Sequence, residues 1–193
     1  MTPRTREQFQ AMRVRTREKI LDRSLVLFAN KGFHGTSIQM IAEAAGISKG
    51  LIYSHFKSKD DLLEAIIRQG FEIMERETAG SADPDPAAYL ANLIEDYYRM
   101  LLKHETFWQL YMGLMFQPGI VLRYKEVMME YYERMVSEYA RIFRALGVKN
   151  ANLEARLLGA IFDGIAINYF FDRERFPLKR MKKILLRRYL PDR

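Results

Sequence analysis

The side chains best suited to contacting a polyanion lie in residues 48–59. If residues 48–56 form a helix, Ile47, Ile52 and Phe56 share one side and can pack inward. The outer side then combines a cation, a glycine, two hydroxyl groups and an exposed leucine, contributed by Lys49, Gly50, Leu51, Tyr53 and Ser54. Such a set suits a DNA groove, where a lysine reaches guanine edges or phosphate and a leucine meets a thymine methyl group.

A second short helix is expected just before this one. Its apolar residues recur at helical spacing and are Ile38, Ile41, Ala42 and Ala45. Thr36 or Ser37 offers an N-cap, Gln39 can complete a capping box with Thr36, and Gly46 ends the helix. Two short helices joined by a tight turn that contains glycine form a helix-turn-helix, which places its second helix in the major groove.

The remainder of the chain reads as helical, and no segment reads convincingly as a strand. The expected helices span about 15–31, 58–79, 86–104, 106–116, 119–146, 151–172 and 177–190, with a break at residues 80–86. The fold class is therefore all-α with about nine helices, a three-helix head and a larger helical body. The expected domains are a flexible basic arm (1–14), a helix-turn-helix DNA-binding domain (15–60) and a ligand-binding and dimerisation domain (61–193), with helix 58–79 connecting the two.

The net charge of +7 is unevenly distributed along the chain. Residues 1–60 hold 11 Lys and Arg against 5 Asp and Glu, residues 61–172 hold 11 against 17, and residues 173–193 hold 9 against 2. A basic head on an acidic body favours a polyanionic partner for the head, because phosphate neutralisation supplies most non-specific affinity for DNA.

Catalytic chemistry has little support in the composition. There is no cysteine, and the three histidines have no acidic or serine partner at a motif spacing, so we expect no enzyme, no metal site and no cofactor. No signal peptide or membrane span is apparent, which favours a cytoplasmic protein that does not enter the membrane. Two alternatives stay open: a helical enzyme or carrier for a hydrophobic small molecule, and a non-specific basic binder of nucleic acid or membrane surfaces.

The stretch Gly32–Lys59, GFHGTSIQMIAEAAGISKGLIYSHFKSK, resembles the DNA-binding signature of the TetR (tetracycline-repressor) family. The resemblance includes the Tyr-x-His-Phe element, the following Ser-Lys and a leucine-bearing helix, and it covers about the first 65 residues. It implies an all-helical fold, a variable ligand-binding body and a homodimer built from the last two helices.

The resemblance also implies roles for single residues. Thr36 and Ser37 would touch a phosphate, Gln39 would reach a base or merely cap its helix, and Tyr53, His55 and Lys59 would hold phosphates. The complete expected DNA-binding set is Thr36, Ser37, Gln39, Ser48, Lys49, Gly50, Leu51, Tyr53, Ser54, His55 and Lys59. Alternatives are a capping or packing role for His55 and an exposed core edge for Tyr53. Leu51 and Ser54 depart from the common family pattern, which leaves the operator sequence open.

Five arginines near the amino terminus allow two interpretations. Arg4, Arg6, Arg13, Arg15 and Arg17 could enter a minor groove or contact the backbone. For Arg4, Arg6 and Arg13 a solvated, disordered arm is the favoured interpretation.

The body is rich in aromatic and methionine side chains, which can line an adaptable apolar cavity or simply form helix cores. The expected ligand-binding residues are Tyr97, Phe107, Trp108, Tyr111, Met112, Met115, Tyr132, Asn168 and Tyr169. The ligand would be a small hydrophobic effector. The expected dimer-interface residues, by family resemblance and by the apolar side of the last helix, are Gly159, Phe162, Asp163, Gly164, Ile184 and Leu185.

These expectations combine into a DNA-binding transcriptional regulator. Its partners would be a palindromic double-stranded DNA operator, a small hydrophobic effector and a second copy of the chain. Repression that the effector relieves is the expected output.

Overall fold

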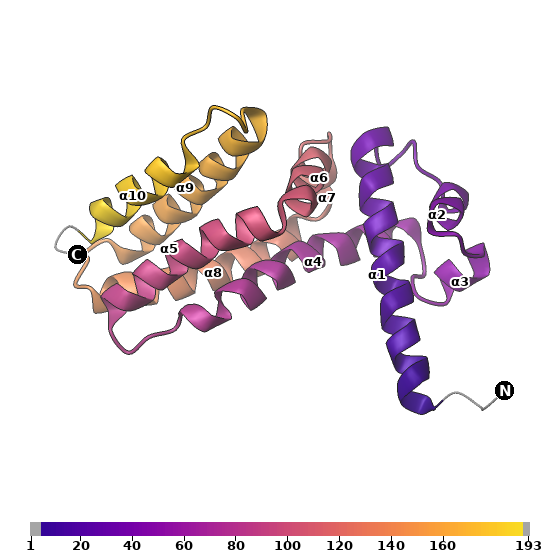
Figure 1. Ribbon diagram of the computed structural model, residues 1–193, viewed down its shortest axis with the longest axis horizontal. Helices are drawn as coiled ribbons and strands as arrows, with labels where there is room; N and C mark the ends of the chain where they lie inside the picture. The colour runs from indigo at the N-terminus through magenta and orange to yellow at the C-terminus, as the bar shows by residue number, and fades with distance from the viewer. Residues whose placement is uncertain (1–4, 191–193) are drawn as a thin grey trace. The chain divides into compact units, whose positions relative to one another are not determined.

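The computed structural model describes residues 5–190, and every regular element within that range is helical (Figure 1). The predicted all-α class is therefore confirmed, with ten α-helices and one short 3-10 helix in the described range. The chain forms two compact units. Unit 1 comprises the residues up to Gln69 together with Leu110–Tyr124, and unit 2 comprises Gly70–Gln109 and the residues from Lys125 onward.

Unit 1 contains the predicted helix-turn-helix. Its elements are α1 (Arg6–Lys31), α2 (Ile38–Ala45), α3 (Lys49–Tyr53), the first part of α4 (Lys59–Thr78), the end of α6 (Glu105–Met115) and α7 (Ile120–Arg123). Fully buried apolar side chains from four of these helices form its core: Ile20, Phe28, Ile41, Ile52, Leu62 and Ile66. Burial of this size stabilises the unit by roughly 2 kcal/mol per side chain before entropy is counted.

The beginning of α1 differs from the prediction. Residues 6–14 were expected to form a flexible arm, but they form the first turns of the 26-residue helix α1. Thr5 caps this helix, because its hydroxyl accepts a hydrogen bond from the Gln8 backbone while the Gln8 side chain accepts one from the Thr5 backbone. Residues 6–14 lack a helical apolar pattern because this part of the helix is exposed on all sides. Arg4 lies outside the described residues.

In unit 2, long helices pack against one another around aromatic side chains. Its elements are the end of α4, the 3-10 helix η1 (Ala79–Ser81), α5 (Pro86–Lys103), the start of α6, α8 (Lys125–Ala145), α9 (Ala151–Phe171) and α10 (Leu178–Tyr189). Asp85 caps α5, and Pro86 occupies its first turn, where a missing N–H costs nothing. Helix α9 packs mainly on α8, and α5 contacts both α8 and α10.

The segment expected as one helix over 119–146 is two helices. It divides at Tyr124, whose backbone leaves the helical region, so that α7 ends at Arg123 and α8 begins at Lys125. Within unit 1 the Tyr124 hydroxyl donates a hydrogen bond of 3.0 Å to the Asp60 carboxylate. This tertiary contact accompanies a break that the local periodicity does not show.

No helix within residues 5–190 combines the length and the apolar character required to cross a membrane.

Candidate nucleic-acid interface

Hydrogen bonds at the helix ends define the turn between α2 and α3. Ser37 caps α2 by accepting a hydrogen bond from the Met40 backbone, and Ser48 caps α3 by accepting one from the Leu51 backbone. Gly46 ends α2 in the left-handed conformation, with φ 62° and ψ 41°, where a side chain would be strained. The Ile47 N–H then bonds to the Ala42 carbonyl, which closes the turn.

The two sides of α3 are clearly different. Ile52 is completely buried, and Phe56 just beyond the helix is buried as well. Leu51 and Tyr53 flank Ile52 in sequence, yet their exposed fractions are 39% and 53%. Such apolar surface on a five-residue helix anchored by its other side is suited to contact with a partner.

Several predicted contact residues lie on this exposed surface. Lys49, Gly50, Ser54 and the two capping serines, Ser37 and Ser48, are all exposed. A Cβ added to Gly50 would meet nothing closer than the Ser48 hydroxyl, at 3.9 Å. Internal packing therefore does not require a glycine here, which fits a position where an external surface approaches the backbone.

Gln39 is also exposed, but it has a local partner. Its amide donates a hydrogen bond to Glu43 on the next turn of α2. The predicted capping box with Thr36 does not form, because Ser37 is the N-cap of α2.

Thr36 departs from its expected role. Its side chain is 1% exposed, and its hydroxyl donates to the carbonyl groups of Leu27 and Gly32 at the end of α1. A hydroxyl engaged in this way has no free surface for a phosphate. The structure thus removes the Thr36 side chain from the expected contact set, and Ser37 is the residue that remains exposed at the start of α2.

Lys59 is half-buried and bound internally. Its ammonium group donates to the carbonyl oxygens of Phe33 and Thr36, at 2.7 and 2.8 Å, and lies 4.4 Å from the centre of the Phe33 ring. Two of its three N–H bonds are thereby used. Its evident role is to hold the loop before α2 against the start of α4, with one N–H left for an external acceptor.

His55 lies beside the positive charge of α1. Its side chain is half-buried, and the pKa of the imidazole is lowered from 6.5, first by burial and then by the nearby charges of Arg13 and Arg17. Arg17 also lies over the ring of Phe56, 5.3 Å from its centre. The electrostatic surroundings of the α3 end therefore include cations from α1.

Residues 110–124 are a part of unit 1 that sequence reasoning missed. The Gln117 side chain accepts a hydrogen bond from the Phe33 backbone N–H, at 3.0 Å, and donates one to the Phe28 carbonyl, at 2.6 Å. The Tyr111 hydroxyl contacts the Ile67 carbonyl at 3.4 Å. These contacts hold the end of α1 and the middle of α4, and their sequence separations of 44 to 89 residues carry no local signal.

The aromatic residues predicted to bind a ligand are mostly packed and hydrogen-bonded. Tyr97 stacks on Phe162 at 3.9 Å, and its hydroxyl donates to the Phe162 carbonyl. The Tyr169 hydroxyl donates to Glu105, and Tyr132 lies beneath Arg156. Of the remaining predicted residues, Trp108 and Tyr111 are buried, Phe107, Met112 and Met115 are half-buried, and Asn168 is exposed. Tyr111, Met112 and Met115 belong to unit 1, whereas the others belong to unit 2.

A cavity of about 570 Å³ in unit 2 has a different character from the one predicted. Charged side chains dominate its lining, including Arg76, Glu77, Asp96, Arg99 and Lys103. None of the predicted ligand-binding aromatic or methionine residues contributes to it.

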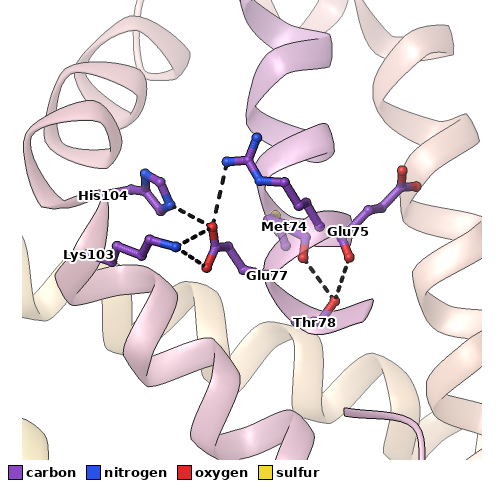
Figure 2. A network of polar contacts seen from close by, with 7 residues as sticks. Met74, Glu75, Glu77, Thr78, Lys103 and His104 are labelled. Carbon is purple, nitrogen blue, oxygen red and sulfur yellow. Dashed lines mark hydrogen bonds and ion pairs between the residues drawn. The ribbon is translucent and has the colours of Figure 1, made fainter. Parts of the chain in front are cut away.

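Glu77 anchors one side of this cavity. Both of its carboxylate oxygens accept hydrogen bonds from Lys103, at 2.9 Å, and one oxygen also contacts the His104 imidazole at 3.0 Å (Figure 2). These two partners lower the pKa of Glu77 to about 2. The end of α4 is thus tied to the end of α5 by a carboxylate that stays ionised at neutral pH.

The predicted dimer residues divide into two groups. Phe162 and Leu185 are buried inside unit 2, and a Cβ on Gly159 would meet the Met135 side chain at 3.1 Å, so these three serve internal packing. Asp163 and Ile184 are exposed, and Gly164 is half-buried. Other large apolar side chains of α9 are exposed as well: Leu153, Leu157 and Phe171.

The two helices, their glycine turn and the outward side of α3 define the class of protein, a helix-turn-helix DNA-binding regulator. Comparison with known proteins supports this class. A model for bacterial regulatory proteins of the tetR family matches residues 20–66. The HTH-type transcriptional regulator YwcC of Bacillus subtilis is 30% identical over 83% of this chain and 78% of its own length.

Solved structures of other proteins share this fold over nearly the whole chain. A TetR-like transcriptional regulator from Rhodococcus sp. RHA1 is 25% identical, covers 98% of this chain and 96% of its own, and has a TM-score of 0.73. The transcriptional regulator FadR from Bacillus subtilis, solved in complex with stearoyl-CoA, shares the fold with a TM-score of 0.72 at 18% identity, over 90% of this chain and 97% of its own. The chain belongs to the TetR family of DNA-binding transcriptional regulators.

Proposed function

We propose that this regulator is a homodimeric repressor that reads a pseudo-palindromic DNA operator with α2 and α3 and leaves it when a small hydrophobic effector binds. The observation that carries the DNA-reading role is the partial exposure of Leu51 and Tyr53 on a helix whose opposite side is fixed by buried Ile52. A regulator of this class acts where the chromosome is, so we place it in the cytoplasm.

Within this proposal the exposed residues have two kinds of role. Lys49 and Leu51 approach base edges, and Gly50 lets the backbone come close. Tyr53 and His55 bind phosphates and set the register without reading sequence. Ser37, Gln39, Ser48 and Ser54 complete the set, and Lys59 contributes through its remaining N–H.

The outward surface of α9 and α10 supports dimerisation. Phe171 and Ile184 are 81% and 60% exposed, and Leu153 and Leu157 continue the apolar surface along α9 at helical spacing. A second copy of the chain would cover this surface and would hold two heads for two half-sites. Ile184→Lys is expected to give monomers in analytical ultracentrifugation, whereas Lys183→Ala, next to it, should leave the dimer intact.

The effector proposal rests on the aromatic core of unit 2. The hydroxyl group of Tyr98, a residue only 4% exposed, has no hydrogen-bond partner among the described residues. An unpaired buried hydroxyl costs about 1–3 kcal/mol, and a ligand with an apolar body and one polar acceptor would relieve that cost. The fold neighbour FadR was solved with stearoyl-CoA, whose acyl chain is apolar.

Release from DNA follows from linkage between the two binding events. An effector that prefers a state with mis-spaced heads must shift the population away from the DNA-bound state. Helix α4 is continuous from unit 1 into unit 2, and its end is held by the Glu77 contacts, so it is one covalent route for such a shift.

Selection from a randomised duplex library, with sequencing of the bound fraction, tests the DNA-reading role. We expect a palindrome with two half-sites about one helical turn apart. Recovery of random sequence by the apo protein, and again in the presence of hydrophobic metabolites, would contradict the proposal. Once the operator is known, a screen for compounds that both raise the Tm and release the DNA tests the effector.

A further inference from the structure

The N-terminal half of α1 extends beyond the core of unit 1. Every residue from Thr5 to Lys19 is exposed except the half-buried Thr16, and the first buried side chain is Ile20. Arg6 is 14 residues before Ile20, which corresponds to about 21 Å of helix. Figure 1 shows this part of α1 continuing past α2 and α3. An exposed extension of this length buries no apolar side chains in the core of unit 1. It therefore adds little to the stability of the fold, which suggests a role in binding.

Three arginines form a stripe along one side of this extension. At 100° per residue, Arg6, Arg13 and Arg17 fall within about 40° of one another. The same side of α1 continues into buried Ile20 and Ser24, which face the core of unit 1. We call Arg6, Arg13 and Arg17 the N-terminal basic stripe. Arg15 points to the opposite side.

The stripe begins beside the end of α3. Arg17 lies over the ring of Phe56, and the charges of Arg13 and Arg17 act on the imidazole of His55. In the described part of the chain, no acidic side chain forms an ion pair with any of the three arginines. The stripe is therefore a row of cations without an ion-pair partner among the described residues, and it begins beside His55 and Phe56 at the end of α3.

The dimensions of the stripe match those of a DNA strand. Arg6 and Arg17 are about 16 Å apart along the helix axis, and one strand of B-DNA carries a phosphate about every 3.4 Å of its axis. A rigid helix of this length can therefore reach more than one phosphate of a strand. A rigid helix also places its charges before binding, so that little conformational entropy is lost when they meet phosphates.

We propose that the N-terminal basic stripe binds the phosphate backbone of the duplex immediately outside the half-site that α3 reads. This inference rests on the proposed function, because α3 must first place the chain on DNA. It adds a sequence-independent contact and a longer footprint. Duplex DNA is the occupant because the stripe begins beside His55, which the proposed function places on a phosphate, and because its charge is complementary to phosphate.

The test uses the full chain and the selected operator. The triple variant Arg6→Ala, Arg13→Ala, Arg17→Ala is compared with wild type, and Arg13→Ala is compared with its matched control Arg15→Ala. Alanine favours helix, so α1 is retained, which circular dichroism checks. Kd is measured from low to moderate salt on two duplexes, one ending flush with the half-sites and one with ten further base pairs on each side.

On the long duplex the triple variant should bind about tenfold or more weakly than wild type. The slope of log Kd against log salt concentration should be smaller by about 2–3 per chain. Arg13→Ala should show part of this loss and Arg15→Ala none. Wild type should prefer the long duplex, whereas the triple variant should not distinguish the two. The selected sequence should stay the same, because phosphate contacts carry no base information.

Two results overturn the inference while leaving the proposed function intact. One is equal salt slopes and equal flank dependence for wild type and the triple variant. The other is equal losses for Arg13→Ala and Arg15→Ala, which would indicate only a general charge effect. Failure of wild type to select any sequence would instead contradict the proposed function itself.

Discussion

The DNA-facing part of unit 1 and the aromatic core of unit 2 use neighbouring side chains in opposite ways. In α3, the buried Ile52 fixes the helix while Leu51 and Tyr53 remain exposed. In α5, Tyr97 and Tyr98 are both buried, but within residues 5–190 only the Tyr97 hydroxyl has a hydrogen-bond partner, the Phe162 carbonyl. The first surface is ready for a partner as it stands. The second is filled by its own side chains, so the proposed effector would require a rearrangement of this core before it binds.

The largest expected effect is that of replacing Ile52, the buried neighbour of Leu51. Ile52→Ala removes a fully buried side chain and should lower the free energy of unfolding by about 3 kcal/mol. It should also abolish operator binding, because α3 loses its anchor. Chemical denaturation and a binding titration measure both quantities.

Leu51→Ala is the matched variant on the exposed side. Its effect on stability should stay within about 0.5 kcal/mol, while base preference changes at one position of each half-site. An unchanged selected sequence would remove Leu51 from base reading, and a large loss of stability would show that it belongs to the core.

The next effect concerns Lys59, which the structure binds internally. Lys59→Met should lower the free energy of unfolding by about 1–3 kcal/mol, because the Phe33 and Thr36 carbonyl oxygens lose a charged donor. Lys57→Met, at an exposed lysine two residues away, serves as the control and should change stability by less than about 0.5 kcal/mol. Equal stability of the two variants would show that the internal bonds contribute nothing.

The tyrosine pair of α5 tests the second half of the comparison. Tyr97→Phe removes a satisfied hydroxyl and should destabilise the protein by about 1 kcal/mol, whereas Tyr98→Phe removes an unpaired one and should be neutral or stabilising by up to about 1 kcal/mol. Thermal unfolding distinguishes the two. Once an effector is found, Tyr98→Phe should also lower the affinity of the protein for it. An unaltered affinity would show that the effector does not bind at the Tyr98 hydroxyl.

The smallest expected effect is a pH dependence through His55. Because the pKa of folded His55 lies below 6.5, the unfolded chain holds more protons between the two pKa values, and stability falls as pH is lowered through that window. A bound phosphate would raise this pKa, so DNA binding should take up a proton. Affinity for all sequences should therefore rise a few-fold from about pH 8 to about pH 6.

His55→Asn should remove this pH dependence of DNA binding. His34→Asn, at an exposed histidine of the same unit, is the matched control and should retain it. If the wild-type affinity shows the same pH profile as the His55 variant, the imidazole does not contact phosphate.

Much of the helical architecture could be predicted from the chain because the relevant signals are local. The capping serines at 37 and 48, the left-handed Gly46 and the apolar spacing in α2 all act within a few residues. The break at Tyr124 and the helical start of α1 were missed. The first coincides with a contact between residues 64 positions apart, and the second is an exposed helix that lacks an apolar side.

The sequence by itself determined the family, the helix-turn-helix and the outward side of α3, because helix periodicity and turn residues encode these over short distances. Only the tertiary structure decided which polar groups remain free for a partner. Thr36 and Lys59 fit the family pattern, yet carbonyl groups of α1 and of the loop before α2 accept hydrogen bonds from the Thr36 hydroxyl and from two of the three Lys59 N–H groups. Likewise, Phe162 turns inward while Asp163, the next residue, stays exposed. Buried donors and side chains contact the groups that the tertiary fold places beside them. These groups lie too far away along the chain to be predicted from local residue spacing.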